Sequence, residues 1–259
     1  MSGTALAPPP ATVLEGRSAL VTGASAGIGR AVALALAGLG ARVTILARRR
    51  GRLEALSREI ADAGGEALPA VGDLRREEDI LGAFAAARER FGGVDILVNN
   101  AGVGREAPLA SGETRHFREM LEVNVLAVAI ATREAVADMR RRGASGHVVH
   151  VSSMSAHRVQ ADFGMYAATK HAVRALTEGL RLELRRIGSD IRVTAVSPAD
   201  TRTEFMESML GGAEAARALE PGYRKLDPED VAAAVVYALT APPHAEVHDI
   251  LLRPVGQPD

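Results

Sequence analysis

The sequence predicts one doubly wound α/β domain, with helices on both faces of a parallel sheet of about seven strands. Seven short runs of apolar or β-branched residues recur along the 259 residues of the chain. Most of the intervening segments show helical spacing of apolar side chains, for example Leu53, Leu56 and Ile60. The short runs are apolar at nearly every position, which is typical of strands covered on both faces. The strands are expected at residues 19–22, 43–46, 67–71, 96–98, 148–151, 193–196 and 250–252.

The amino-acid composition indicates which class of molecule the protein binds. The formal net charge is −1, from 31 basic and 32 acidic residues, so the chain has no overall field to attract nucleic acid or an anionic membrane. A small molecule is the expected partner. The chain contains no cysteine, which excludes disulfides and thiolate metal sites. A reducing compartment is compatible with this absence, and a cytoplasmic location is expected.

The limits of the domain also follow from the residues. The first fifteen residues include Pro8, Pro9 and Pro10 but neither the basic segment nor the apolar core of a signal peptide. We therefore expect a disordered tail at residues 1–15 and a single domain at residues 16–259. Within that domain, the mixed segment at about residues 200–225 is expected to form a variable substrate lid.

A glycine-rich turn follows the first predicted strand, where an open parallel sheet places its ligand-binding edge. The turn reads Thr-Gly-Ala-Ser-Ala-Gly-Ile-Gly at residues 22–29 and leads into a helical stretch. Glycine lets the backbone turn tightly and approach a pyrophosphate, whose charge the free N–H groups of a helix start can bind. Gly23, Gly27 and Gly29 therefore predict a dinucleotide site, with an ordinary strand-to-helix turn as the alternative.

The same turn is compatible with a different enzyme class. Residues 23–27 also satisfy the GxSxG pattern of α/β-hydrolases, in which Ser25 would be the nucleophile. Asp200 with His244 or His248 would complete a triad by chain order alone. That nucleophile normally follows several strands, whereas this turn follows the first, so the dinucleotide interpretation is favoured.

The residues after the second predicted strand bear on the choice of dinucleotide. NAD-binding folds place an acidic residue about twenty residues beyond the glycines, where it binds the ribose 2′-hydroxyl. This chain has Arg48 and Arg49 there, and a guanidinium suits a 2′-phosphate. The sequence thus favours NADP over NAD, and a solvated run of arginines is the competing explanation.

Tyr166 and Lys170 form the expected catalytic pair. They stand four residues apart on a predicted helix, so their side chains share one face. The chain has three tyrosines and only two lysines, and a lysine at this spacing indicates a site that needs a compact ammonium rather than a guanidinium. A neighbouring cation lowers the pKa of a phenol, which can then exchange a proton with a carbonyl oxygen.

Polar side chains near the ends of other predicted elements complete the constellation. Ser153, thirteen residues before the tyrosine, offers a hydroxyl that can orient a substrate carbonyl. The three asparagines of the chain are Asn99, Asn100 and Asn124. An asparagine in the middle of an apolar helix needs a hydrogen-bonding reason, and a proton-relay or site-ordering role would supply one for Asn124.

Together these motifs resemble the short-chain dehydrogenase/reductase family from about residue 16 to residue 257. TGxxxGxG at residues 22–29, NNAG at residues 99–102, Ser153 and YxxxK at residues 166–170 follow the family's order and spacing. The resemblance implies a Rossmann-type domain that, as an NADP(H)-dependent oxidoreductase, interconverts a carbonyl and an alcohol. An NAD-dependent alcohol dehydrogenase is the alternative. The family resemblance also implies that the protein is a homotetramer or homodimer. It further implies four catalytic residues: Asn124, Ser153, Tyr166 and Lys170.

The resemblance further implies a set of cofactor-binding positions, in which Asp73 contacts the adenine, Lys170 the nicotinamide ribose and residues 198–203 the carboxamide. The full set is Gly23, Ser25, Ala26, Gly27, Ile28, Gly29, Arg48, Arg49, Asp73, Leu74, Asn100, Ala101, Gly102, Tyr166, Lys170, Pro198, Thr201 and Thr203. No metal is expected.

Two residues depart from the family's pattern. Ala199 follows Pro198 where the family usually has glycine, which predicts a backbone shift near the nicotinamide. Ala26 stands where some NADP enzymes of the family carry a basic residue, which leaves Arg48 as the main argument for NADP.

The segment from residue 226 to residue 254 is similar to a bacterial subgroup of NADP-dependent 3-hydroxy acid, serine and clavulanic acid dehydrogenases. This similarity implies a small aldehyde or β-keto substrate, for which His157, Arg158 and Arg202 are candidate carboxylate ligands or ordinary surface residues. A regulator that binds the dinucleotide without turnover is a third class. The complete set of catalytic residues argues against it.

Overall fold

The strands of the computed structural model, which describes residues 10, 12–218 and 220–258, form one parallel sheet in the order β3-β2-β1-β4-β5-β6-β7. The strand order reverses between β1 (Ser18–Thr22) and β4 (Ile96–Asn99), which is where such sheets bind ligands. All seven predicted strands are present, so the predicted fold class is confirmed. The other strands are β2 (Arg42–Ala47), β3 (Glu66–Val71), β5 (His147–Val151), β6 (Arg192–Pro198) and β7 (Asp249–Leu252).

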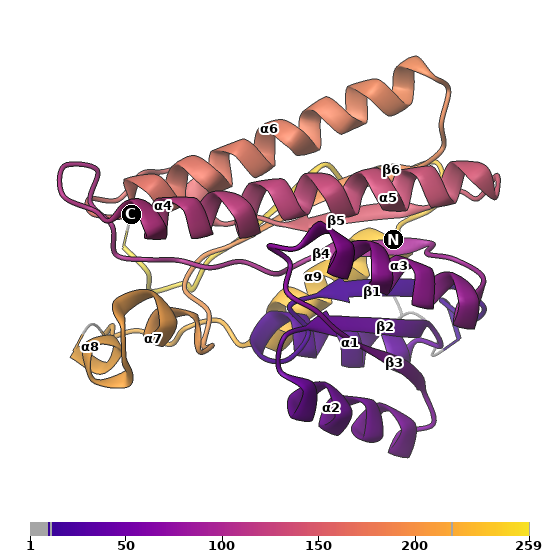
Figure 1. Cartoon of the computed structure of the whole chain (residues 1–259), viewed down its shortest axis with the longest axis horizontal. Helices are drawn as coiled ribbons and strands as arrows, with labels where there is room; N and C mark the ends of the chain where they lie inside the picture. Colours follow the sequence, from indigo (N-terminus) through magenta and orange to yellow (C-terminus); the bar gives the residue numbers. More distant parts are fainter. Residues whose placement is uncertain (1–9, 11, 219, 259) are drawn as a thin grey trace, which may run out of the picture.

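Helices cover both faces of this sheet (Figure 1). One face packs against α1 (Gly27–Gly38), α2 (Arg50–Asp62) and α9 (Pro228–Thr240). The other packs against α3 (Glu77–Phe91), α5 (Ala127–Arg141) and α6 (Gly164–Arg186). In β1, Val21 faces the first group of helices and Leu20 the second, and both side chains are fully buried. Because neither face meets solvent, the strand is apolar throughout.

The remaining elements lie around the carboxyl ends of the strands. α4 (Thr114–Leu121) continues through a π-helical turn, η1 (Glu122–Leu126), directly into α5. A short 3₁₀ turn, η2 (Met154–Ala156), follows β5. Within the predicted lid lie α7 (Phe205–Leu210) and α8 (Ala213–Ala218), which stand away from the layered body in Figure 1.

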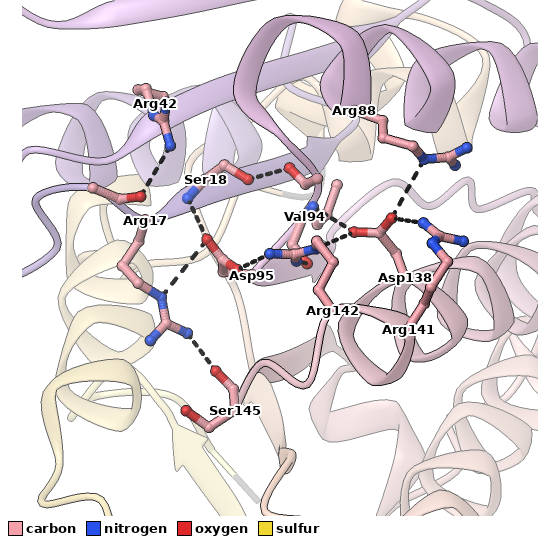
Figure 2. A network of polar contacts seen from close by, with 12 residues as sticks. Arg17, Ser18, Arg42, Arg88, Val94, Asp95, Asp138, Arg141, Arg142 and Ser145 are labelled. Atoms are coloured by element: carbon pink, nitrogen blue, oxygen red, sulfur yellow. Dashed lines mark hydrogen bonds and ion pairs between the residues drawn. The ribbon is translucent and has the colours of Figure 1, made fainter.

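A network of hydrogen bonds and ion pairs lies at the amino ends of the central strands, opposite the ligand-binding side of the sheet (Figure 2). The side chain of Asp138, in the last turn of α5, is 2% exposed and accepts a hydrogen bond from the backbone N–H of Val94 at 2.9 Å. Arg142 donates to Asp138 at 3.0 Å and to Asp95 at 2.8 Å. Asp95 also accepts from the backbone N–H of Ser18 at 2.9 Å. The network therefore joins the start of β1 and the segment before β4 to the end of α5.

The predicted disordered tail at residues 1–15 lies largely outside the described residues. Residues 12–15 differ from the prediction because they form a turn. The Leu14 side chain is 6% exposed and belongs to the core that contains α1, and its backbone N–H donates to the carbonyl of Leu39 at 2.9 Å. In the described ranges, no helix has the length and apolar character needed to cross a membrane.

Candidate active site

A cleft of about 540 Å³ lies at the carboxyl ends of the strands, where sequence analysis placed the ligand site. The structure brings all but two of the predicted catalytic and cofactor-binding residues to its lining. These are Gly23, Ser25, Ala26, Gly27, Ile28, Arg48, Arg49, Asp73, Leu74, Asn100, Ala101, Gly102, Ser153, Tyr166, Lys170, Pro198, Thr201 and Thr203. The two that lie behind the lining are Gly29 and Asn124.

The glycine-rich turn leaves the start of α1 open toward the cleft. Gly23 and Gly27 have φ angles of 68° and 53°, a backbone conformation that glycine adopts without the strain imposed by a side chain. Ala26 stands at the N-cap, where no side chain satisfies the first N–H groups of the helix. Gly27 and Ile28 line the cleft. These N–H groups at the positive end of the helix fit a pyrophosphate.

Gly29 lies behind the cleft lining, where its lack of a side chain lets α1 pack closely against Gly23 and Asn100. A Cβ atom at this position would lie 2.6 Å from the carbonyl oxygen of Gly23 and would also collide with the Asn100 amide. That amide donates to the carbonyl of Thr22 at 2.9 Å, and the hydroxyl of Thr22 accepts from the backbone N–H groups of Asn100 and Ala101, each at 3.0 Å. The Asn-Asn-Ala-Gly stretch thus braces the glycine-rich turn.

Arginines lie beside this turn at the end of β2. The guanidinium of Arg49 donates to the hydroxyl of Ser25 at 2.9 and 3.1 Å and to the carboxylate of Glu204 at 2.8 Å. Arg48 is exposed at the margin of the cleft. Asp73 also lines the cleft, and a hydrogen bond from Arg75 holds the pKa of its carboxyl below the usual range. The guanidinium groups of Arg48 and Arg49 can bind an anionic group beside the glycine-rich turn.

The geometry does not support the hydrolase alternative. The hydroxyl of Ser25 is held by Arg49, and Asp200 accepts a hydrogen bond from the Tyr223 hydroxyl at 2.9 Å. Neither His244 nor His248 lines the cleft. A serine nucleophile needs a histidine within hydrogen-bonding reach to take its proton, and the predicted triad is therefore not assembled.

The predicted catalytic residues come together at the start of α6. The side chains of Tyr166 and Lys170 lie one helical turn apart, and these residues are 8% and 4% exposed. The ammonium of Lys170 lies 5.8 Å from the centroid of the Tyr166 ring and donates to the backbone carbonyl of Val151 at 3.0 Å. The hydroxyls of Tyr166 and Ser153 are hydrogen-bonded to each other. A phenol, a hydroxyl and an ammonium thus converge on one point of the cleft.

Burial dominates the proton affinities of this group. It raises the pKa of Tyr166 to about 12, although the hydrogen bond with Ser153 opposes the increase. It also lowers the pKa of Lys170 to about 8. The expected lowering of the tyrosine pKa is therefore not found, because the buried site disfavours the phenolate more than the hydrogen bond favours it.

Asn124 positions its neighbours instead of lining the cleft. It lies in η1, a π-helical turn rather than the regular α-helix that the sequence suggested. Its side chain accepts from the backbone N–H of Val103 at 2.8 Å and donates to the carbonyl of Val103 at 2.8 Å. It also donates to the Thr169 hydroxyl at 3.0 Å. Asn124 therefore ties the segment after β4 to the residue that precedes Lys170.

Sequence analysis predicted a lid at about residues 200–225 but not the side chains that line the neighbouring end of the cleft. That end is lined mainly by apolar residues and by a few uncharged polar ones. They are Val103, Met154, Ser155, Gln160, Phe163, Phe205, Met206, Met209, Tyr223 and Gln257. The spacing of Phe205, Met206 and Met209 was a signal for an apolar helical face within the lid.

Three residues were predicted to bind a substrate carboxylate, but none of them lines the cleft. They are His157, Arg158 and Arg202. The His157 ring hydrogen-bonds to the Ser197 hydroxyl at 3.3 Å, and Arg202 forms an ion pair with Asp227.

Ala199, which stands where the family usually has glycine, adopts a backbone conformation that does not require glycine. Of the non-glycine residues in the described ranges, Asp162 alone has a positive φ angle. Ala199 therefore adopts a conformation that is open to any residue. Its backbone N–H donates to the carbonyl of Leu252 at 2.8 Å, which joins the end of β6 to the end of β7.

Comparisons with known proteins agree with this geometry. The chain matches the model of the family described as short chain dehydrogenase over residues 17–212. It is 48% identical over 247 residues to dehydrogenase/reductase SDR family member 11 of Bos taurus, across 93% of this chain and 97% of the relative. It is 41% identical to farnesol dehydrogenase of Aedes aegypti, with the same coverage of both chains. The closed form of a serine dehydrogenase complexed with NADP+ has a TM-score of 0.87 at 30% identity, covering 93% of this chain and 96% of that one.

Proposed function

Because the chain belongs to the short-chain dehydrogenase/reductase family and is thus an NAD(P)-dependent oxidoreductase, we propose that it interconverts a carbonyl and an alcohol with NADP(H), using Tyr166 as general acid and base. The observation that carries this proposal is the convergence of Tyr166, Ser153 and Lys170 in the cleft. The cofactor supplies or accepts the hydride at the reacting carbon. The protein must bind the substrate oxygen and move one proton to or from it.

Tyr166 performs the proton transfer. With a pKa of about 12 its hydroxyl is protonated at neutral pH, as an acid that donates to a carbonyl oxygen must be. Ser153 shares a hydrogen bond with the same phenol and orients the substrate oxygen toward it. The donated proton leaves negative charge on the phenol, which the ammonium of Lys170 stabilises.

Other residues hold these groups in place. The carbonyl of Val151 fixes the ammonium of Lys170 at 3.0 Å. Asn124 contacts both Val103 and Thr169, so it sets the distance between α6 and the segment that follows β4. Fixed positions of this kind keep the reacting groups aligned and lower the entropic cost of reaction.

The arginines at the end of β2 support NADP as the preferred dinucleotide. Arg48 and Arg49 both line the cleft, and the Arg49 guanidinium lies within hydrogen-bonding distance of the Ser25 hydroxyl in the glycine-rich turn. A guanidinium binds a phosphate through paired, charge-assisted hydrogen bonds. No acidic residue follows β2 directly to bind a free 2′-hydroxyl.

Titration of NADPH and NADH into the wild type and into Tyr166→Phe tests the proposal. Nicotinamide fluorescence is a clean probe because the chain contains no tryptophan. We expect both proteins to bind NADPH equally and more tightly than NADH. Aldehyde reduction should be at least about 100-fold slower in the variant, because general acid catalysis contributes about 10² to 10⁴ in rate.

Tyr237→Phe is the matched control, since Tyr237 lies on α9 and is 62% exposed. It should retain the wild-type reduction rate. A Tyr166→Phe enzyme that reduced aldehydes at that rate would exclude Tyr166 as the proton donor. A wild type that bound NADH more tightly than NADPH would reverse the proposed cofactor preference.

A further inference from the structure

Methionine and phenylalanine side chains collect around Tyr166. Five of the chain's seven methionines and three of its five phenylalanines pack in the apolar cluster that contains Tyr166 or line the cleft. They are Met120, Met154, Met165, Met206, Met209, Phe117, Phe163 and Phe205. The ring of Phe205 lies 5.5 Å from that of Tyr166, centroid to centroid. We call the part of the cleft bounded by Met154, Phe163, Phe205, Met206 and Met209 the apolar pocket.

The positive groups that line the cleft are already bound to protein atoms or lie at its far end. Lys170 donates to a backbone carbonyl, and Arg49 is held by Ser25 and Glu204. Arg48 lies at the end of β2, beside the glycine-rich turn. A substrate carboxylate in the apolar pocket would therefore lose its hydration without gaining a cation, which is costly.

Other polar groups of the cleft lining are also unsuited to a substrate anion. Asp200 lines the cleft and accepts a hydrogen bond from the Tyr223 hydroxyl at 2.9 Å, and a second carboxylate beside it would be repelled. Gln160 and Gln257 supply uncharged polar groups. The electrostatics of this end thus favour a neutral molecule.

We propose that the substrate is an uncharged aldehyde, ketone or alcohol whose reacting carbon carries a hydrocarbon chain or ring, and that substrates bearing a carboxylate are rejected. This inference rests on the proposed function and names the substrate class of the same site. Of the small aldehyde or β-keto substrate that the bacterial subgroup implied, it keeps the uncharged compounds and excludes the acids. The unbranched thioether of methionine adapts to different shapes, so the enzyme accepts a range of apolar substrates rather than one.

Substrate pairs of equal length test the proposal directly. We would measure kcat/KM with saturating NADPH for butanal, hexanal and octanal, each paired with the ω-oxo acid of the same chain length. Each added methylene should raise kcat/KM about fourfold until the pocket is filled, which corresponds to about 0.8 kcal/mol per buried methylene. Each oxo acid should fall at least about 100-fold below its aldehyde. Oxo acids that matched their aldehydes, or no gain with chain length, would overturn the proposal.

A second measurement does not depend on turnover. Octanol should displace a hydrophobic fluorescent dye from the cleft of the cofactor-free protein, whereas its ω-hydroxy acid should not. If octanol displaced the dye but no aldehyde were reduced, the apolar pocket would stand and the proposed reaction would fall. Equal displacement by the alcohol and the hydroxy acid would refute the apolar pocket.

A positive charge placed in the apolar pocket should narrow the preference for aldehydes over oxo acids. Met206→Lys adds one positive charge to the lining, and we expect it to raise kcat/KM for the oxo acids about tenfold while lowering the value for the aldehydes. Glu207→Gln makes the same change in net charge at the next residue, which is exposed and lies outside this cleft. Equal shifts in the two variants would show that overall charge, not the pocket, sets selectivity.

Discussion

Arg49 and Glu204 lie 2.8 Å apart, guanidinium to carboxylate, and join the end of β2 to the residue before α7. Glu204 also forms an ion pair with Arg52 at 2.6 Å, and the two arginines hold its pKa below the usual range. These side chains are about half exposed, so the pairs contribute little to stability. These pairs matter because of their position. The carboxylate of Glu204 occupies the guanidinium of Arg49, which we propose binds the 2′-phosphate.

Glu204→Gln should therefore tighten NADPH binding. The substitution removes a negative charge that competes with the phosphate for Arg49, and we expect a two- to tenfold lower Kd for NADPH, on the order of 1 kcal/mol. The Kd for NADH should stay the same, since that dinucleotide has no 2′-phosphate. Fluorescence titration measures both constants, and Glu207→Gln provides the control for net charge. An equal effect on the two dinucleotides would place the phosphate away from Glu204.

Arg48→Ala and Arg49→Ala should each weaken NADPH binding by about 10- to 100-fold, because a hydrogen bond to a charged group contributes about 1.5 to 3 kcal/mol. NADH binding should change less than about threefold. Arg50→Ala serves as the comparison, since the Arg50 side chain is 71% exposed and does not line the cleft. If the Arg50 variant lost as much NADPH affinity as the other two, general surface charge would explain the preference.

The two reaction directions should respond differently to pH. Tyr166 has a pKa of about 12, so its deprotonated form, which accepts a proton during alcohol oxidation, increases as pH rises toward that value. Reduction uses the protonated form, which predominates throughout the neutral range. We expect kcat/KM for oxidation to rise between about pH 6 and pH 9, with no such rise for reduction. The rise should flatten above pH 8, because Lys170, with a pKa of about 8, loses its charge there. Parallel profiles in the two directions would exclude this assignment.

Stability should depend strongly on the network in Figure 2. Asp138→Ala leaves the buried N–H of Val94 without its acceptor and removes one of the carboxylates bound to the Arg142 guanidinium, and we expect a loss of about 3 kcal/mol in the free energy of unfolding. Urea denaturation measures this loss. Glu89→Ala, at an exposed position on α3, should change the free energy by less than about 0.5 kcal/mol. NADPH affinity should remain at the wild-type value in both variants, because the network lies at the edge of the sheet away from the cleft.

The features that the sequence predicted are those with a local signature. The strands appear as apolar runs, and the glycine-rich turn follows β1 within a few residues, so their neighbours along the chain reveal them. The contact between Arg49 and Glu204 spans 155 positions, and no local pattern indicates it. Leu14 is similar, because its burial depends on the end of α1 rather than on the prolines that precede it.

The role of Asn124 could be predicted from the sequence only in part. Its polarity within an apolar stretch predicted a hydrogen-bonding role, and the bonds to Val103 and Thr169 agree with that hypothesis. The π-helical turn in which Asn124 lies has no counterpart in the apolar periodicity. The pKa of Tyr166 was likewise beyond sequence reasoning, because it depends on burial by elements distant in the chain.

The methionines that shape the apolar pocket also expose it to oxidants. Oxidation converts a flexible thioether into a polar, chiral sulfoxide, and Met206 is partly accessible in the lid. A sulfoxide there would bring a strong dipole next to the hydrocarbon part of the substrate. Although the chain lacks cysteine, its turnover of apolar compounds would thus be sensitive to peroxide and recoverable by methionine sulfoxide reductases.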